Sequence, residues 1–360
     1  MEGTDAPVNV GDYERLAEEA LDEGSFGYFA GGAGDEHTVR HNREAFDGWR
    51  LRPRMLVDVS SVSTAATVLG HEVAMPILTA PVAYQRMAHP DGEAAVARAA
   101  AAVGTIMCLS TFATTGLAEV AAAAPEGRRW FQLYWHPDRG VTRTLLDQAR
   151  DSGFSAVVFT VDVPVLGRRE RDLRTGFTLK PDYRIETYGS ALGDLGALTP
   201  ALAAELIDPR LSWRDLEWLH EAAGMPVLAK GILTAEDAVL AADHGCAAVV
   251  VSNHGGRQLD RSVASLDALP EVVEAVADRV EVLMDSGVRR GTEAAIAIAL
   301  GARAVLVGRP VVWGLAVDGA DGVRHVLELL RDELAQALAL LGCPTPGHLG
   351  REHLVRAGRA

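Results

Sequence analysis

The chain has 360 residues, of which 48% are hydrophobic, and its net charge is −15 from 34 Lys and Arg against 49 Asp and Glu. A chain of this length and composition can bury a large core, and one α/β barrel with insertions fits it as well as two domains do. The acidic balance, without a Lys and Arg block of the kind that follows a phosphate backbone, argues against a nucleic-acid partner. A few local arginines can still bind a small anionic substrate.

The sequence gives no sign of export or of membrane insertion. Residues 1–5 are polar and acidic rather than a basic segment followed by an apolar one. No apolar run is long enough to cross a bilayer. Cys108, Cys246 and Cys343 are scattered and lack metal-site spacing, which fits a reducing compartment. We therefore expect a cytoplasmic protein with no membrane contact and no bound metal.

The first part of the chain predicts a helix followed by irregular structure. Apolar residues recur at helical spacing from Asp12, and an aromatic, glycine-rich run follows at 26–34. Within that run, Tyr28 could either pack in the core or aim its hydroxyl into a site. Residues 46–74 are expected to form irregular segments and short strands that cover one end of the domain.

From residue 76 onward, short apolar runs alternate with Ala-rich stretches of helical periodicity such as Glu93–Val103 and Thr234–His244. The runs predict eight strands, at 76–80, 106–109, 130–134, 156–161, 226–229, 247–251, 280–284 and 304–307. Eight βα units favour an α/β fold of the (β/α)8 TIM-barrel type. A doubly wound sheet is the alternative, but the Gly-x-Gly-x-x-Gly turn after its first strand is missing.

The connection between the fourth and fifth strands is unusually long, at about 65 residues. It begins with a basic stretch, 164–171, and continues through 177–210, where glycines and prolines interrupt any periodicity. A long insertion on this side of a barrel predicts a mobile lid, here 177–210, within one domain spanning 1–360. The stretch Val323–Leu341 predicts an amphipathic helix that either closes the barrel or meets a partner subunit.

The stretch Val249–Asp260 concentrates the chemistry of the chain. Three valines predict a buried strand, which ends abruptly in Ser-Asn-His-Gly-Gly-Arg. The two glycines permit a tight turn. His254 and Arg257 can thus face one small ligand that carries both an acidic proton and a carboxylate.

The other predicted strands also end in polar or glycine-bearing clusters, which is where barrel enzymes build their active sites. Those clusters supply Gln, Tyr, Asp, Lys, His and Arg side chains together. The seventh and eighth strand ends combine Gly287 and Gly308 with Arg289 and Arg309, a pattern typical of phosphate binding. No Walker sequence is present, so a phosphorylated substrate or cofactor is favoured over a nucleoside triphosphate.

Residues 252–260, Ser-Asn-His-Gly-Gly-Arg-Gln-Leu-Asp, resemble the signature of the FMN-dependent 2-hydroxy acid oxidases and dehydrogenases. That family includes glycolate oxidase, lactate oxidase and mandelate dehydrogenase. The resemblance covers residues from about 11 to 345 and rests on specific motifs. These further motifs lie at 80–83, 89–93, 131–134, 160–162, 167–169, 230–231, 285–291 and 308–310.

The resemblance implies that FMN lies across the barrel mouth. The flavin would rest on the backbone of Pro81, Val82 and Ala83 and would hydrogen-bond Ser110, Gln132 and Thr160. Lys230 would lie near the N1 and O2 edge, where negative charge develops on reduction. The phosphate would take the loops at Asp285–Arg289 and Gly308–Arg309. The cofactor-binding residues implied in these two loops and beside Lys230 are Ser252, Asp285, Ser286, Gly287, Arg289, Gly308 and Arg309.

The same resemblance implies roles around the substrate. Arg257 and Arg169 would hold its carboxylate with help from the Tyr28 hydroxyl. Tyr134 would hydrogen-bond the substrate hydroxyl. His254 would be the base, and Asp162 would orient it and stabilise the imidazolium. Hydride and carbanion mechanisms both remain open. Phe112, Tyr84 and Leu166 are expected either to line the pocket or to pack in the core.

The implied reaction is oxidation of an (S)-2-hydroxy acid to the 2-oxo acid, with O2 reduced to hydrogen peroxide. Residues 82–85 resemble the bacterial 4-hydroxymandelate oxidases, and Phe112 stands where glycolate oxidases carry Trp, so mandelate or 4-hydroxymandelate is the expected substrate. Residues 285–287, however, resemble the lactate-oxidising members. The alternatives are an oxidase of lactate or another aliphatic acid, a dehydrogenase with a quinone or protein acceptor, a phosphosugar-type isomerase and a non-catalytic binding protein. A homo-oligomer, most often a tetramer in similar barrels, is expected.

Overall fold

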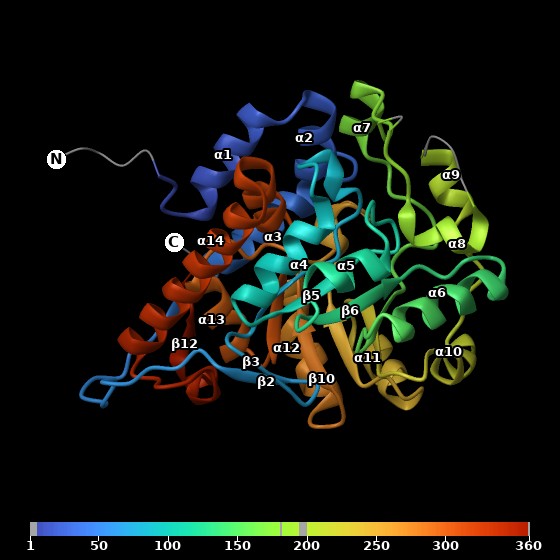
Figure 1. Cartoon of the computed structure of the whole chain (residues 1–360). Helices are drawn as coiled ribbons and strands as arrows, with labels where there is room; N and C mark the ends of the chain where they lie inside the picture. Colours follow the sequence, from blue (N-terminus) through green and yellow to red (C-terminus); the bar gives the residue numbers. More distant parts are fainter. Residues whose placement is uncertain (1–5, 181, 194–199, 359–360) are drawn as a thin grey trace.

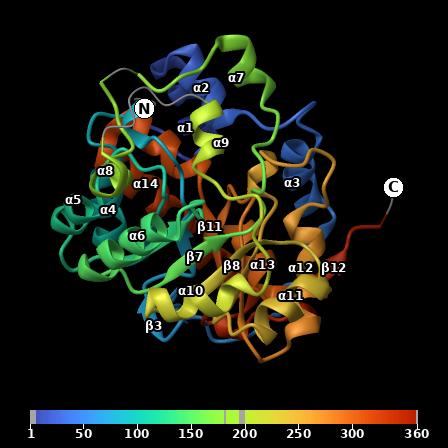
Figure 2. The same ribbon diagram turned by 90° about the vertical axis from the view of Figure 1, so that its right-hand side faces the viewer.

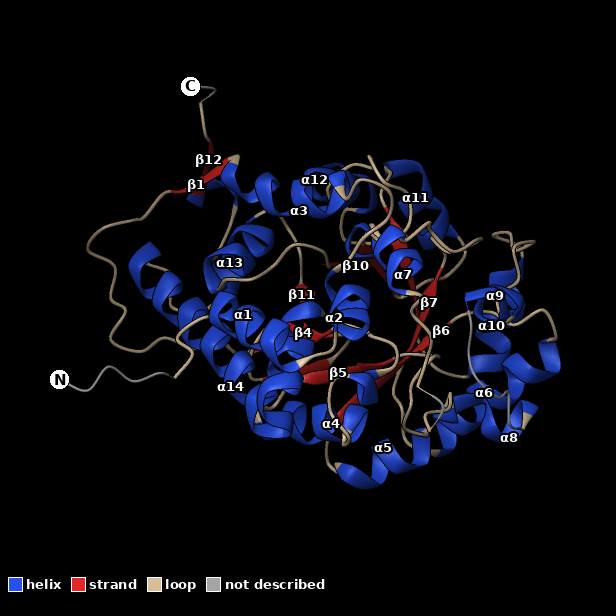
Figure 3. Ribbon diagram, turned by 90° about the horizontal axis from the view of Figure 1, so that it is seen from above, coloured by secondary structure: helices blue, strands red, loops and turns tan. Residues whose placement is uncertain are grey.

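A computed structural model describes residues 6–180, 182–193 and 200–358 of the chain. At its centre eight parallel strands form a closed barrel (Figure 3), which confirms the predicted (β/α)8 fold. In chain order the barrel strands are β4 (Ile77–Thr79), β5 (Ile106–Leu109), β6 (Arg128–Leu133), β7 (Val157–Thr160), β8 (Val227–Ile232), β9 (Ala248–Val251), β10 (Glu281–Met284) and β11 (Ala304–Val307). Every predicted strand is present, and the largest difference is that β8 extends to Ile232.

The barrel strands are apolar on both faces because each face is covered. In β9, Val250 packs in the barrel interior with Trp130 and Leu283, whereas Val249 and Val251 pack outward with the helices. Side chains alternate along a strand, so one continuous apolar run can serve both the interior and the helix layer. This is why short continuous apolar runs predicted the strands.

Helices surround the barrel (Figures 1 and 3). Those between or after barrel strands are α4 (Gly92–Ala102), α5 (Leu117–Ala123), α6 (Arg139–Asp151), α10 (Asp215–Ala223), α11 (Ala235–Asp243), α12 (Ser265–Val276), α13 (Gly291–Ala299) and α14 (Arg309–Leu341). The helix predicted at 323–341 is the second part of α14, which kinks at Asp318 and Gly319. The apolar residues of its predicted face are buried, and α14 packs on α1, α4 and α13 of the same chain, as the barrel-closing alternative requires.

The two ends of the barrel differ. A hairpin of β2 (Ala66–Val68) and β3 (His71–Val73) closes the amino-terminal end, where Val68 and Val73 join the interior cluster. The helices α1 (Val10–Ala20), α2 (Glu23–Ala30) and α3 (His37–Asp47) precede the barrel, with α2 near the opposite end (Figure 1). A separate small sheet pairs β1 (Trp49–Leu51) with β12 (Leu354–Arg356).

The long connection between β7 and β8 carries α7 (Glu170–Thr175), α8 (Gly189–Leu192) and α9 (Pro200–Glu205). Helix α7 packs beside α2, far away in the sequence (Figures 1 and 2). Within the expected lid, Leu179, Tyr188 and Ile207 are buried, while residues 181 and 194–199 lie outside the described part. Movement of this segment stays a prediction. No helix in the described ranges has the length and apolarity to span a membrane.

Candidate active site

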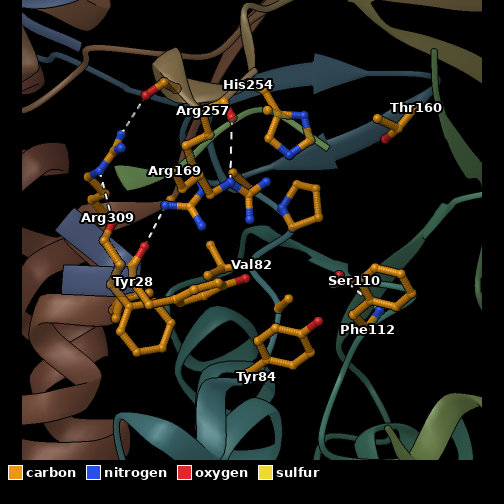
Figure 4. A pocket seen from close by; sticks show the side chains of 18 of the residues that line it. Tyr28, Val82, Tyr84, Ser110, Phe112, Thr160, Arg169, His254, Arg257 and Arg309 are labelled. Atoms are coloured by element: carbon orange, nitrogen blue, oxygen red, sulfur yellow. Dashed lines mark hydrogen bonds between the residues drawn. The ribbon is translucent and has the colours of Figure 1, made fainter. Parts of the chain in front are cut away.

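A cavity of about 620 Å³ lies at the carboxyl ends of the barrel strands (Figure 4). The predicted site residues that line it are Tyr28, Pro81, Val82, Ala83, Ser110, Gln132, Tyr134, Thr160, Arg169, Lys230, His254, Arg257, Asp285, Ser286, Gly287, Arg289, Gly308 and Arg309. The remaining two, Asp162 and Ser252, contact His254 from behind the wall. Motifs from all eight strand ends therefore converge on one space.

His254 forms a partly buried pair with Asp162. Its Nδ1 lies 3.0 Å from Asp162 Oδ1, so an Nδ1–H donates to the carboxylate and Nε2 keeps its lone pair. The Tyr134 hydroxyl lies 3.3 Å from that Nε2. Burial lowers the pKa of His254, although Asp162 opposes the shift. A neutral imidazole with a fixed tautomer is suited to accept a proton.

Two residues around Asp162 explain how its carboxylate is placed. Gly231 has φ +110°, and a Cβ there would lie 2.6 Å from the Cβ of Asp162. The glycine after Lys230 is thus required for the close approach of β7 and β8. Gln258 Nε2 donates to the carbonyls of Asp162 and Val165, at 3.0 and 2.9 Å. Gln258 lies within the motif at 252–260, which did not indicate this role.

Lys230 is the centre of a hydrogen-bonded network at the bottom of the cavity. Its Nζ lies 2.9 Å from Ser252 Oγ and 3.1 Å from Asp285 Oδ2. Asp285 also accepts from Ser286 Oγ at 2.7 Å, and Ser286 Oγ accepts from Gly255 N at 3.0 Å. Burial alone would lower the pKa of Lys230, but Asp285 and then Asp162 raise it. The ammonium therefore stays charged and fixed across β8, β9 and β10.

Arg257 has one side of its guanidinium satisfied and the other free. Its Nη1 donates to the backbone carbonyls of Tyr28 and Gly31, and the guanidinium lies 4.6 Å from the centre of the Tyr28 ring. Its Nη2 is buried and has no hydrogen-bond partner among the described residues. Arg169 lies beside it (Figure 4), with its Nη2 3.4 Å from Gln258 Oε1. Burial, and next the charge of Arg169, lower the pKa of Arg257, a sign that an anion is needed here.

Arg309 and Arg289 place two further positive charges at the other end of the cavity. Burial lowers the pKa of Arg309 to about 9 and that of Arg289 to about 10. Arg309 also ties α2 to the turn after β9, because it donates to the carbonyls of Gly31 and Gly255 at 2.7 and 3.0 Å. This structural role was not foreseen from sequence. Two partly buried cations near Gly308, at the start of α14, fit a phosphate.

The buried polar atoms between these ends fit a flavin. Gln132 Nε2 and Thr160 Oγ1 belong to cavity-lining residues, and no hydrogen-bond partner for either lies within residues 6–180, 182–193 and 200–358. Orphaned buried donors of this kind are costly unless a ligand satisfies them. The nitrogen and oxygen edge of an isoalloxazine ring supplies such partners, and the phosphate of FMN would meet the two arginines. No His, Cys, Asp and Glu cluster suited to a metal occurs in the described residues.

Aromatic rings cover one wall of the cavity. Tyr84 and Phe112 stack with their centroids 6.2 Å apart, and Phe112 lies 5.0 Å from Tyr134. Tyr84, Phe112 and Leu166, which sequence reasoning left between pocket and core, all line the cavity. The insertion adds lining residues that sequence reasoning missed, since no motif or periodicity marks them; these are Leu173, Asp172, Phe177, Thr178, Leu179, Ala203 and Ala204.

Comparison with known proteins agrees with this geometry. Residues 17–356 match the family described as FMN-dependent dehydrogenase. The chain is 49% identical to an L-lactate oxidase from Nostoc sp., covering 95% of this chain and 96% of the relative. It is 46% identical to glycolate oxidase 3 from Oryza sativa, covering 97% and 96%. A solved mandelate oxidase with (S)-4-hydroxymandelic acid is 42% identical, with a TM-score of 0.91 over 98% of this chain and 99% of that one.

Proposed function

The chain belongs to the FMN-dependent dehydrogenase family, and from this premise we propose that it oxidises an (S)-2-hydroxy acid to the 2-oxo acid with O2 as the electron acceptor. The chain is thus an FMN-dependent oxidoreductase. This membership argues against the phosphosugar isomerase and the non-catalytic binding protein. One observation carries the choice of substrate class. The partly buried base His254 and the unpartnered Nη2 of Arg257 line the same cavity, where a carboxylate and an adjacent acidic proton can meet both.

The proposed mechanism assigns the binding step to Arg257 and Arg169, which hold the substrate carboxylate with the Tyr28 hydroxyl. Charge-assisted hydrogen bonds from a guanidinium give both affinity and orientation. The Tyr134 hydroxyl donates a hydrogen bond to the substrate hydroxyl oxygen; burial raises the pKa of Tyr134, so the phenol keeps its proton. A substrate held in this way presents its acidic proton to His254.

The proton then moves to His254 Nε2, and Asp162 stabilises the imidazolium that forms. Bound FMN supplies the two-electron acceptor for this chemistry. The ammonium of Lys230 stabilises negative charge at the bottom of the cavity, where its bonds to Ser252 and Asp285 fix it. Hydride and carbanion routes use the same protein groups.

We propose mandelate or 4-hydroxymandelate as the substrate, because the cavity wall formed by Tyr84, Phe112 and Tyr134 suits an aromatic ring. The likeness to mandelate oxidase structures supports this choice. Lactate is the second candidate, since the L-lactate oxidase from Nostoc sp. is more similar in sequence.

A panel of (S)-2-hydroxy acids tests the proposal. The purified enzyme is given mandelate, 4-hydroxymandelate, lactate and glycolate, and O2 uptake and peroxide formation are measured together. The expected result is the highest kcat/KM for an aromatic acid, with one peroxide formed per O2. A preference for lactate selects the second candidate. Slow O2 uptake with fast reduction of a quinone dye would establish a dehydrogenase instead.

We also propose a cytoplasmic homotetramer. Cys108, Cys246 and Cys343 are all free and buried, as is usual in a reducing compartment, and this supports the cytoplasmic location.

The number of chains in the particle is measured by light scattering coupled to size-exclusion chromatography. A mass near four chains supports the tetramer, and a single-chain mass contradicts it.

A further inference from the structure

A carboxylate lines the substrate end of the cavity, and no step of the mechanism uses it. Asp172 lies on α7 and shares the cavity wall with Arg169 and Arg257. Asp172 is half-buried. Within the described residues, the Asp172 side chain makes no hydrogen bond and no ion pair. A carboxylate held near two arginines without pairing to either calls for an explanation.

Contacts on both sides of Asp172 hold it at the wall. Arg171 forms an ion pair with Glu36 at 2.7 Å, which fastens α7 to the chain segment after α2. The ring of Phe177 stacks on Tyr28 with centroids 4.5 Å apart and planes at 15°. The Phe177 N–H also donates to the carbonyl of Asp172 at 2.9 Å. The position of the carboxylate is therefore fixed by packing rather than by an ion pair of its own.

The electrostatics agree with this geometry. Burial raises the pKa of Asp172, whereas Arg257 and then Arg169 act in the opposite direction. The two guanidinium charges thus act on the carboxylate through the cavity. Arg168 also lines the wall, but it is exposed, and water screens its charge.

The other charged groups of the cavity belong to the strand ends and to the FMN phosphate end. Lys230 pairs with Asp285, and the carboxylate of Asp162 accepts the Nδ1–H of His254 and is attracted by Lys230. Arg289 and Arg309 lie at the end assigned to the FMN phosphate. The substrate end is therefore left with two positive charges, from Arg169 and Arg257, and one negative charge, from Asp172.

We propose that Asp172 is a specificity-determining residue that restricts the site to 2-hydroxy acids with a single carboxylate. One substrate carboxylate together with Asp172 balances the two arginines. A second carboxylate on the substrate would stand uncompensated near Asp172, where like charges repel. This proposal rests on the proposed function, because it takes Arg169 and Arg257 as the carboxylate-binding pair.

The test compares two ligands of nearly equal size that differ by one charge. Succinate carries two carboxylates, and succinamate replaces one of them with an amide; neither has a hydroxyl group to be oxidised. Each is titrated into the FMN-loaded enzyme, with calorimetry and the visible absorption of bound FMN as readouts. The wild type is expected to bind succinamate about tenfold more tightly than succinate.

Three variants separate the cavity charge from other effects. Asp172→Asn keeps the shape and removes the charge, so the preference for succinamate should fall to within about twofold. Asp172→Glu keeps the charge and should retain the preference. Glu170→Gln removes a carboxylate from the same helix that pairs with Arg174 and does not line the cavity, so it should also retain the preference.

Several outcomes would overturn the role of Asp172. These are equal binding of the two ligands by the wild type, an unchanged preference in Asp172→Asn, and loss of the preference in Glu170→Gln as well. Failure of the proposed function would look different, because no 2-hydroxy acid would reduce the FMN although the binding preference persisted. An unchanged FMN spectrum and melting temperature in each variant show that the protein has folded.

Discussion

The bottom and the top of the cavity are built in different ways. The bottom, formed by the strand ends with Lys230, Ser252, His254 and Asp285, is tied together by buried hydrogen bonds between neighbouring strands. The top, formed by α7 to α9 of the long insertion, contacts the rest of the chain beside the cavity through a surface ion pair and the ring of Phe177 on Tyr28. Farther along the insertion, Thr187 donates a buried hydrogen bond to the carbonyl of Thr111. We infer from this difference that the two parts have different functions: the residues at the bottom perform the chemistry, and those at the top select the substrate.

The largest effect is expected at the bottom of the cavity. His254→Ala removes the base, so FMN reduction by any 2-hydroxy acid should slow by about 10²–10⁴-fold. Anaerobic stopped-flow absorbance measures the rate. The FMN content should stay unchanged, because His254 is not assigned to the cofactor. Reduction at the wild-type rate would remove His254 from the role of base.

The next effect is expected at Arg257, which connects the bottom to the top through Tyr28. Arg257→Lys keeps the charge but cannot both hold the Tyr28 carbonyl and offer a free Nη2 to the substrate. Loss of a charged hydrogen bond of about 1.5–3 kcal/mol should lower kcat/KM roughly 10- to 150-fold, with KM raised and kcat lowered. An unchanged kcat/KM would show that the carboxylate binds elsewhere.

The pH dependence of kcat/KM reports the state of the base. Only neutral His254 accepts the proton, so kcat/KM should be constant at high pH and fall about tenfold per pH unit below the pKa. Burial lowers that pKa from its ordinary value of 6.5, which places the midpoint below 6.5. In Asp162→Asn the midpoint should move further down, since Asp162 raises the pKa. A wild-type midpoint above 6.5 contradicts this environment.

The smallest effect is expected at the top. Phe177→Ala removes the ring stacked on Tyr28, an interaction of about 0.5–1.5 kcal/mol, so KM should rise roughly 2- to 12-fold with kcat nearly unchanged. Steady-state kinetics with two substrates of different size measure the change. A drop in kcat as large as that of His254→Ala would erase the distinction between the two parts of the cavity.

The same difference between the bottom and the top of the cavity explains which features were predictable from the sequence. The strands and the bottom of the cavity were predictable, because apolar runs end in polar motifs and parallel strands bring those ends together. Asp172 and Phe177 could not be foreseen, since an irregular insertion has no periodicity to fix which side chains face inward. The carbonyl contacts of Arg309 and the kink of α14 at Gly319 depend on long-range packing that local patterns do not encode.

The measurement that tests the central claim most directly is the visible spectrum of the purified protein without oxygen, before and after addition of (S)-mandelate. We predict a yellow flavin that bleaches on mixing and regains its colour when air is admitted. A flavin that stays oxidised with mandelate but bleaches with lactate would identify an aliphatic 2-hydroxy acid as the substrate. A flavin that no 2-hydroxy acid bleaches would contradict the proposed function.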